Sequence, residues 1–199
     1  EPFPVRDLFA AMNDTFGPAC RERGVRLRLR QDPALPERLV GDEARIRQIL
    51  FNLAGNAVKF TLAGEVSVEA TAMPGPGPDR TLLLFTVADT GIGIPEDKLD
   101  SIFESFIQVE NASTRRFQGA GLGLAIVRRL VQLMEGSLAI ESALGCGTSI
   151  QCALPLRLPP AAAGPEQAAP QPDELAPGRP LRILLVEDEV VNRTALRLM

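Results

Sequence analysis

Four polar residues, Gln48, Asn52, Asn56 and Lys59, follow one another at steps of four, four and three residues. In a helix this spacing places carboxamides and an ammonium group within neighbouring turns of one face. An amide oxygen is a hard, neutral ligand that suits Mg²⁺, and the Lys59 ammonium group could contact the phosphates with which Mg²⁺ usually shares its coordination. The solvated face of an ordinary amphipathic helix would show the same pattern, so this row alone leaves both interpretations open.

A helix over residues 42–61 is predicted to hold this polar row. Apolar residues recur in it at the spacing i, i+3, i+4, i+7, which lays a stripe along one side that faces a core. These residues are Ile46, Ile49, Leu50, Leu53, Ala57 and Val58. Asp42 is expected to cap the start of the helix, and Gly64 lies just past its end as a stop.

Asp89 ends an apolar segment, residues 81–88, that is predicted to form an interior strand. A carboxylate at the end of a strand can hold a ligand that carries a hydrogen-bond donor, such as the exocyclic amine of adenine, and Gly91 and Gly93 would allow close approach of the backbone. An Asx-turn is the alternative. The Asp-Thr-Gly triplet of aspartic proteases is disfavoured, because it occurs once and Ile92 follows it.

Gly119, Gly121 and Gly123 open a further predicted helix. Glycines at a helix start leave backbone N–H groups free to meet phosphate oxygens, although close helix packing would also require them. Neither a dinucleotide-binding nor a P-loop pattern fits their surroundings. The polar loop over residues 107–120 is long enough to suggest a function of its own. The helix is expected to bury Leu124, Val127, Leu130, Val131 and Met134.

The other predicted elements would complete a mixed α/β fold. A helix over 5–23 is expected to break or kink at Gly17-Pro18 and to end at Gly24. A short helix begins at Pro95. Strands are predicted over residues 25–30, 66–72, 137–142 and 148–155. The three arginines of the first strand are expected to form a solvated face.

Composition excludes several classes of protein. The chain has 199 residues, 45% of them apolar, which is enough for one core and part of a second. Its pI of about 5.0 argues against nucleic-acid binding, and it shows neither a signal peptide nor an apolar run of roughly 18 residues for membrane contact. Histidine is absent, which removes Ser/His/Asp triads, Cys/His dyads and imidazole-bound zinc. Cys20, Cys146 and Cys152 are expected to be reduced, buried thiols.

The last part of the chain differs from the rest. Residues 157–180 contain seven prolines among alanines and polar residues, which predicts a linker. Residues 181–186 form a new apolar strand pattern that ends in Glu187 and Asp188, and clustered carboxylates there suit a divalent cation. The piece up to Met199 is too small to form a domain.

Four motifs, taken together, resemble the N, G1, F and G2 boxes of the ATP-binding domain of sensor histidine kinases. They are NLAGNAVKFT, DTGIGI, FESF and GAGLGL, at residues 52–61, 89–94, 103–106 and 119–124. The resemblance implies a two-layer α/β sandwich of the Bergerat ATP-binding type, with helices on one face of a mixed sheet. It also implies a catalytic domain over 1–156, the linker over 157–180, and over 181–199 the start of a domain that is similar to a receiver.

The resemblance implies ATP and Mg²⁺ as cofactors. Asn56 would hold Mg²⁺, Asn52 would support the phosphate site and Lys59 would contact the phosphates, so these three residues form the implied catalytic set. Glu187 and Asp188 would be half of a receiver metal site. The triphosphate would lie against Gly119, Gly121 and Gly123.

By the same resemblance the Asp89 carboxylate would contact the adenine amine, while Gly91 and Gly93 let the base approach. Phe103 and Phe106 would position a flexible lid. Further nucleotide contacts are expected from Phe60, Ile94, Arg116, Ala120, Leu122, Leu124 and Thr148. The chain departs from the family pattern at Ala120, where a hydroxyl residue is usual, and at Gln118, where glycine is frequent.

Two alternatives share this fold. ATPases such as gyrase, MutL and Hsp90-type chaperones use a glutamate, four residues before the Mg²⁺ asparagine, to activate water. This chain has Asn52 there, and because an amide cannot take the proton from water, slow hydrolysis and phosphoryl transfer to another acceptor are expected. A nucleotide-free pseudokinase that serves as an interaction module is the second alternative, motivated by Ala120.

Kinases of this family phosphorylate a histidine on a neighbouring helical dimerisation domain, which this chain lacks. Glu1 is not a natural start, so the chain is expected to be the catalytic part of a longer, homodimeric hybrid kinase that transfers phosphate in trans. Its partners would be that dimerisation domain and a receiver domain or response regulator. The expected location is the cytoplasm, where the chain could belong to a membrane-anchored sensor.

Overall fold

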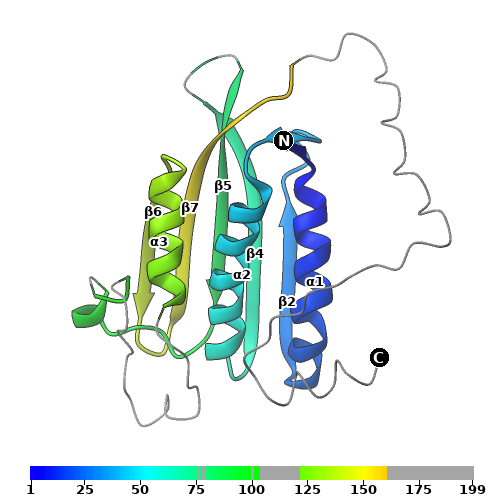
Figure 1. The fold of residues 1–199 in the computed structure, drawn as a ribbon. Coiled ribbons are helices and arrows are strands. Elements are labelled where there is room, and N and C mark those ends of the chain that lie inside the picture. Colours follow the sequence, from blue (N-terminus) through cyan, green and yellow to red (C-terminus); the bar gives the residue numbers. More distant parts are fainter. Residues whose placement is uncertain (76, 78, 100, 104–121, 161–199) are drawn as a thin grey trace, which may run out of the picture. The chain divides into compact units, whose positions relative to one another are not determined.

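The computed structural model describes residues 1–75, 77, 79–99, 101–103 and 122–160. Residues Glu1–Ala161 form one compact unit. In the described part of this unit three α-helices pack over one face of a seven-stranded sheet (Figure 1). The helices are α1 (Val5–Glu22), α2 (Glu43–Phe60) and α3 (Gly123–Leu133). None of the described helices is long and apolar enough to cross a membrane.

The sheet is mixed, because β2 pairs with β4 in parallel while all other pairs are antiparallel. Its order is β1-β3-β7-β5-β4-β2, and β6 also pairs with β7. The strands are β1 (Pro2–Phe3), β2 (Val25–Gln31), β3 (Leu39–Val40), β4 (Gly64–Pro74), β5 (Arg80–Asp89), β6 (Ser137–Ala143) and β7 (Gly147–Arg157). The predicted fold class, a two-layer α/β sandwich with helices on one face of a mixed sheet, is confirmed.

The core lies between α2 and the central strands. Leu83, Phe85 and Val87 alternate along β5 and are buried against the helices. All six apolar residues predicted for the stripe of α2 are buried as well. Each large aliphatic or aromatic side chain contributes about 1.5–3 kcal/mol on full burial. This packing therefore holds α2 in one position along the sheet.

The ends of α2 agree only in part with the prediction. Asp42 is the N-cap, since its carboxylate accepts a hydrogen bond from the backbone N–H of Arg45 at 3.1 Å. At the other end Thr61, not Gly64, terminates the helix, and its hydroxyl donates to the carbonyl of Ala57 at 2.7 Å. Gly64 is instead the first residue of β4, with φ +109°.

A break in α1 at Gly17-Pro18 was one of two predicted outcomes and is wrong, whereas the other, a kink there, stays a prediction. The helix continues through Pro18, which lacks the N–H group that would bond to the preceding turn. Met12 and Cys20, on either side of the proline, are both buried. The packing of residues before and after Pro18 in the core thus outweighs the loss of one helical hydrogen bond. Gly24, with φ +68°, follows the C-cap of the helix as predicted.

Other predicted elements need smaller corrections. Short strands β1 and β3 were not predicted, because two residues are too few for a periodic pattern. The helix after Pro95 is a 3₁₀ turn, η1 (Glu96–Lys98). In α3 only Val127 and Val131 are fully buried, while the other three predicted core residues are half-buried. Among the cysteines, Cys146 is exposed rather than buried.

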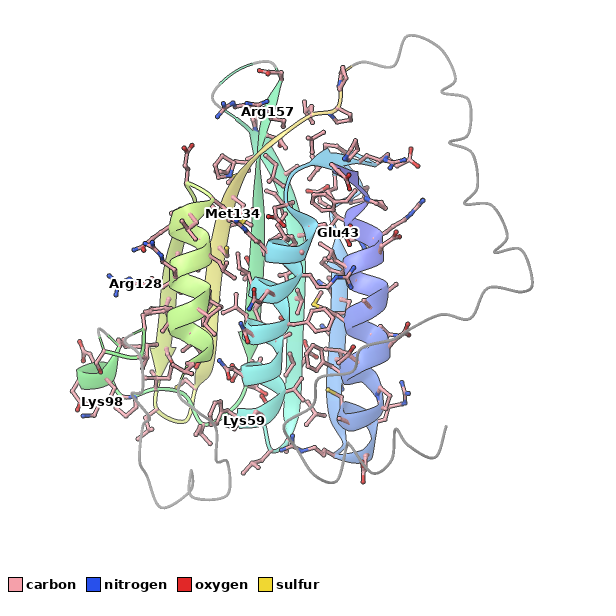
Figure 2. The ribbon with its side chains drawn as sticks, viewed as in Figure 1. Glu43, Lys59, Lys98, Arg128, Met134 and Arg157 are labelled. Carbon is pink, nitrogen blue, oxygen red and sulfur yellow. The ribbon has the colours of Figure 1, made fainter. Side chains whose placement is uncertain are left out.

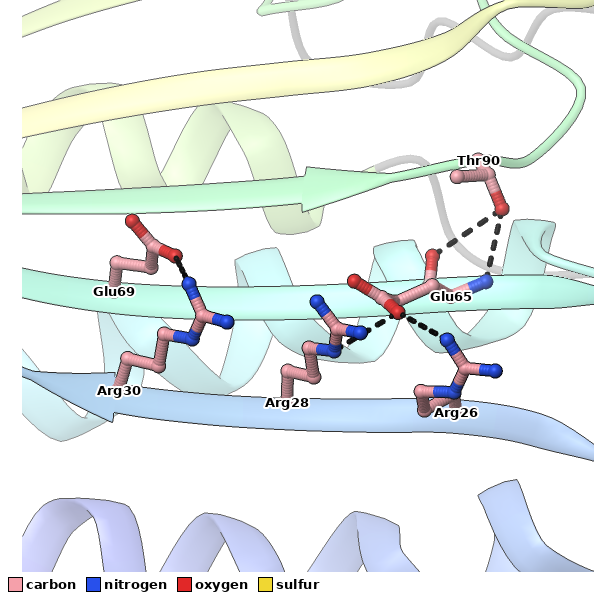
Figure 3. A network of polar contacts seen from close by, with 6 residues as sticks. All are labelled: Arg26, Arg28, Arg30, Glu65, Glu69 and Thr90. Atoms are coloured by element: carbon pink, nitrogen blue, oxygen red, sulfur yellow. Dashed lines mark hydrogen bonds and ion pairs between the residues drawn. The ribbon is translucent and has the colours of Figure 1, made fainter.

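The arginines of β2 are exposed, as predicted, but they are also paired. Arg26 and Arg28 both contact the carboxylate of Glu65, at 3.2 and 3.1 Å, and Arg30 lies 3.5 Å from that of Glu69 (Figure 3). Such exposed pairs contribute little stability individually. Their regular placement follows from the register of β2 and β4, in which each arginine lies opposite or next to a glutamate.

Candidate functional site

Segments that are far apart in the sequence meet where β5 ends. Gly123, at the start of α3, lies over the polar face of α2: a Cβ added to it would be 3.7 Å from Oδ1 of Asn52 and 3.8 Å from Nδ2 of Asn56. The turn after β5 joins the end of α2, because the N–H of Ile92 donates to the carbonyl of Phe60 at 3.3 Å. The part of α2 that carries Asn52 and Asn56, the turn after β5 and the start of α3 therefore lie next to one another and form one candidate site (Figure 1).

Asn52 and Asn56 line one end of this site, which we call the amide end. Both side chains are half-buried, and neither amide forms a hydrogen bond with another residue that the structure describes. Their oxygens thus retain the capacity to bind a cation or a donor group. Lys59 follows on the same helix, with its ammonium group 5.1 Å from the centroid of the Phe60 ring.

Asp89 lies at the other end of the site, which we call the acid end. Its Oδ1 accepts a hydrogen bond from the backbone N–H of Gly91 at 2.8 Å, so the Asx-type contact considered as an alternative does form. A carboxylate offers about four lone-pair positions, so the bonds from the backbone N–H groups of Gly91 and Thr148 leave room for a further donor. The turn and a ligand-binding role are therefore compatible.

Burial raises the pKa of Asp89, and hydrogen bonds from the backbone N–H groups of Gly91 and Thr148 partly oppose this rise. The carboxylate thus sits where its charged form is incompletely solvated. A carboxyl group with a perturbed pKa is frequent at functional sites, although structural networks also produce such shifts.

The two glycines of the turn are required by the protein's own packing. A Cβ at Gly91 would lie 2.4 Å from the carbonyl oxygen of Phe60, and a Cβ at Gly93 would lie 2.0 Å from that of Ala143. Gly93 also has φ +67°, a conformation that disfavours other residues. Their predicted role in admitting a base stays a prediction, whereas their contacts with α2 and β6 are direct.

Thr90, between Asp89 and Gly91, connects the acid end to β4. The N–H of Glu65 donates to the Thr90 hydroxyl at 2.9 Å, and this hydroxyl donates to the Glu65 carbonyl at 3.4 Å (Figure 3). The N–H of Thr90 also donates to the Glu65 carbonyl, at 3.0 Å. The backbone around Asp89 is thereby held on both sides, by the end of α2 and by the start of β4.

Sequence reasoning missed Ser142, at the end of β6. Its hydroxyl accepts from the N–H of Ile94 at 2.8 Å, donates to the carbonyl of Gly147 at 2.8 Å and lies 2.9 Å from the hydroxyl of Thr148. The alternation of β6 offered a signal, because it puts Ser142 on the same face as the apolar residues Leu138 and Ile140. A polar residue at such an inward position needs partners.

Gln48 does not belong to the site. It lines a separate concavity of about 910 Å³ near the N-terminal end of α2. Figure 2 shows Glu43, which also lines that concavity, and Lys59 at opposite ends of the helix. None of the residues predicted to contact nucleotide or metal lines it. The predicted polar row is therefore divided between two regions of the surface.

The remaining predicted contacts fall into two groups. The residues of the first group are half-buried: Ile94, Phe103, Leu122, Leu124 and Thr148. Leu122 precedes α3, and Leu124 packs against the core. The other residues lie outside the described ranges, and the predictions for them stay predictions: Phe106, Arg116, Gln118, Gly119, Ala120, Gly121, Glu187 and Asp188.

Comparison with known proteins agrees with this geometry. Residues 41–158 match the model of the family described as histidine kinase-, DNA gyrase B-, and HSP90-like ATPases. The chain belongs to this family. The match covers the acid end, the amide end and the helices α2 and α3.

Relatives place the chain among the histidine kinases of that family. It is 37% identical over 195 residues to the autoinducer 2 sensor kinase/phosphatase LuxQ of Vibrio vulnificus, a match that covers 98% of this chain and 23% of LuxQ. It is 38% identical over 164 residues to hybrid signal transduction histidine kinase A of Dictyostelium discoideum, covering 79% of this chain and 8% of that protein. The chain thus spans about a quarter or less of these relatives.

A solved structure gives the same result. The crystal structure of full-length ShkA in complex with AMPPNP matches with a TM-score of 0.69 and 37% identity, over 81% of this chain and 32% of that one. The predicted family and domain type, the ATP-binding catalytic domain of sensor histidine kinases, are confirmed.

Proposed function

We propose that this chain binds ATP together with Mg²⁺ and transfers the γ-phosphoryl group to a histidine on a dimerisation domain of the same parent protein. The observation that carries the proposal is the approach of Gly123 to the two half-buried amides of Asn52 and Asn56. It joins the start of a helix, which favours phosphate, to oxygen donors of the type that suits Mg²⁺.

In this arrangement each end of the site has a separate task. Asn56 would hold the Mg²⁺ ion, which neutralises phosphate charge when it is bound. Asn52 and Lys59 would orient the phosphates, and the Asp89 carboxylate would accept a hydrogen bond from the adenine amine. Asn52 cannot act as a general base toward water, which supports transfer to a histidine over hydrolysis.

The proposal extends to the parent protein. Its dimerisation domain would present the histidine, and a receiver domain or response regulator would accept the phosphoryl group next. Because the reaction consumes ATP, the domain would work in the cytoplasm. Residues 181–199, which are similar to the start of a receiver, would supply only Glu187 and Asp188 to a metal site.

Binding can be tested first with residues 1–199 and a fluorescent ATP analogue, with and without Mg²⁺. Asn56→Ala should remove the Mg²⁺-dependent part of the affinity, a loss of roughly 10- to 100-fold, which is the size expected for a contact to a charged group. Gln48→Ala is the matched control, since it removes an amide from the same helix outside the site. Equal effects of both substitutions, or no binding by the wild type, would contradict the proposal.

Transfer is tested by adding γ-labelled ATP and the purified dimerisation domain of the parent protein. Label is expected on the histidine of that domain, with little release of free phosphate when the domain is left out. Fast phosphate release by the chain alone would instead indicate an ATPase. Tight binding without transfer or release would indicate an interaction module.

A further inference from the structure

Three polar residues form a row across three neighbouring strands at the acid end. Asp89 on β5 lies opposite Thr148 on β7, and Thr148 lies opposite Ser142 on β6. Directly opposed residues of antiparallel strands point to the same side of a sheet. Alternation along β5 and β7 makes this the side of Val87 and Ile150, which are buried under the helices.

The hydroxyl of Ser142 uses all of its hydrogen-bonding capacity within the protein. A serine hydroxyl has one proton and two acceptor positions. The carbonyl of Gly147 can only accept, so the proton of Ser142 points to it, at 2.8 Å. The N–H of Ile94 occupies one acceptor position, also at 2.8 Å. In the remaining contact, at 2.9 Å, the donor must therefore be Thr148.

This assignment determines what Thr148 can offer to a ligand. Its single proton is used in the bond to Ser142, so its oxygen can only accept further hydrogen bonds. The ionised Asp89 carboxylate beside it also only accepts. Two neighbouring groups that both accept favour a ligand with N–H donors at this position and disfavour one with a carbonyl oxygen.

We propose that Ser142 is a positioning residue for purine selection. Its oxygen accepts a hydrogen bond from the Thr148 hydroxyl, so the Thr148 oxygen beside Asp89 can only accept further hydrogen bonds. The site therefore prefers adenine to guanine nucleotides. Adenine has an amine at its position 6, where guanine has a carbonyl oxygen. This inference rests on the proposed function, because it concerns the same nucleotide site. It adds a residue that contacts no ligand itself and acts through Thr148.

The experiment compares the affinities of ADP and GDP, measured by calorimetry in the presence of Mg²⁺. We expect wild-type protein to prefer ADP, and Ser142→Ala to reduce the ADP:GDP preference by roughly three- to tenfold, the size of one neutral hydrogen bond. Without Ser142 the Thr148 hydroxyl can turn its proton to the carbonyl of guanine. Ser142→Thr retains the hydroxyl and should restore the wild-type ratio. Ser149→Ala is the control, since Ser149 is the next residue of β7 and points to the other side of the sheet.

The ratio separates selection from a general loss of structure. If Ser142→Ala lowers both affinities by the same factor, Ser142 is only structural and the inference is wrong. Thr148→Val covers the case in which Ser142→Ala does not fold, because it leaves the Ser142 bonds to Ile94 and Gly147 in place and should reduce the same ratio. An unchanged ratio there overturns the inference alone, whereas no binding of either nucleotide by the wild type overturns the proposed function with it.

Discussion

The two ends of the site differ in how far the protein satisfies its own polar groups. At the acid end, Asp89 accepts the N–H of Gly91, and Ser142 makes hydrogen bonds to three residues. At the amide end, the side chains of Asn52 and Asn56 have no hydrogen-bond partner among the described residues. The polar groups of the acid end therefore help to hold the fold together, whereas the amides of Asn52 and Asn56 form no hydrogen bond that would do so among the described residues.

This difference separates stability from binding. A pre-organised group loses little conformational entropy when a ligand binds. Its affinity for the ligand then depends on the packing that holds the group in place. Substitutions at the acid end should thus change folding and binding together. Substitutions at the amide end should change mainly binding, because no hydrogen bond to another described residue is lost with the amides.

The largest effect is expected from Gly93→Ala. The new Cβ would meet the carbonyl oxygen of Ala143, and the positive φ alone costs about 1–2 kcal/mol. Urea denaturation should show a loss of more than about 3 kcal/mol in the free energy of unfolding, with nucleotide binding abolished. Gly24→Ala is the control, since Gly24 also has a positive φ but has no atom within 4 Å of the added Cβ. Equal costs at both positions would show that the turn is not tightly packed.

Asn52→Ala should weaken nucleotide binding and leave the stability of the fold almost unchanged. The free energy of unfolding should stay within about 0.5 kcal/mol of the wild type, as for a surface substitution. The affinity for Mg²⁺-ATP should fall by roughly tenfold, because a contact to phosphate is lost. Urea denaturation and titration of the same preparation give both quantities. A clear loss of stability would mean that the amide end is also part of the framework.

Asp89 should make stability and binding depend on pH in opposite directions. Burial raises its pKa in the folded state above the unfolded value of about 3.9, so the folded protein binds more protons between the two values. The free energy of unfolding of the ligand-free protein should therefore fall as the pH rises through this window. Nucleotide affinity should rise over the same window, because the ionised carboxylate is the acceptor.

Asp89→Asn should remove both trends and should raise the Tm of the ligand-free protein at pH ~7 by a few degrees. Melting curves of both proteins, measured from pH ~4 to pH ~7, check this expectation. Asp97→Asn is the control, since Asp97 is an exposed carboxylate on η1. A wild-type protein that is more stable than Asp89→Asn at neutral pH would show that backbone hydrogen bonds outweigh the cost of burial.

Local patterns predicted the parts of the site that depend on one element. The apolar stripe of α2 and the Asp42 cap follow from spacing and residue type, and so does the position of Asp89 at the end of an apolar strand. These features depend on neighbours within a few residues. They required no knowledge of which strands are adjacent.

Features that depend on distant segments were not predictable in the same way. Gly91 and Gly93 were assigned to ligand approach, but the groups that exclude a side chain there are the carbonyls of Phe60 and Ala143. Ser142 gains its role from the register of β6 on β7, which the sequence of either strand alone does not contain. The acid end is therefore the part where sequence reasoning was least complete.

The smallest effect is expected at Cys146, in the turn of the β6–β7 hairpin. Burial raises the pKa of Cys152 to about 12 and also raises that of Cys20, whereas Cys146 is exposed. A thiol reagent at pH ~8 should therefore modify Cys146 first in the folded protein, since the thiolate is the reactive form. Counting labelled thiols by mass spectrometry checks this order.

The rate of that labelling also tests the comparison between the two ends. Ser142 holds the hairpin through Gly147, and the N–H of Gly145 donates to the carbonyl of Ile92 at 2.8 Å. Because the hairpin is already held, saturating Mg²⁺-ADP should change the labelling rate of Cys146 by less than about twofold. Protection of tenfold or more would mean either that the nucleotide covers Cys146 directly or that its binding orders the hairpin, and in the second case the acid end is not pre-organised.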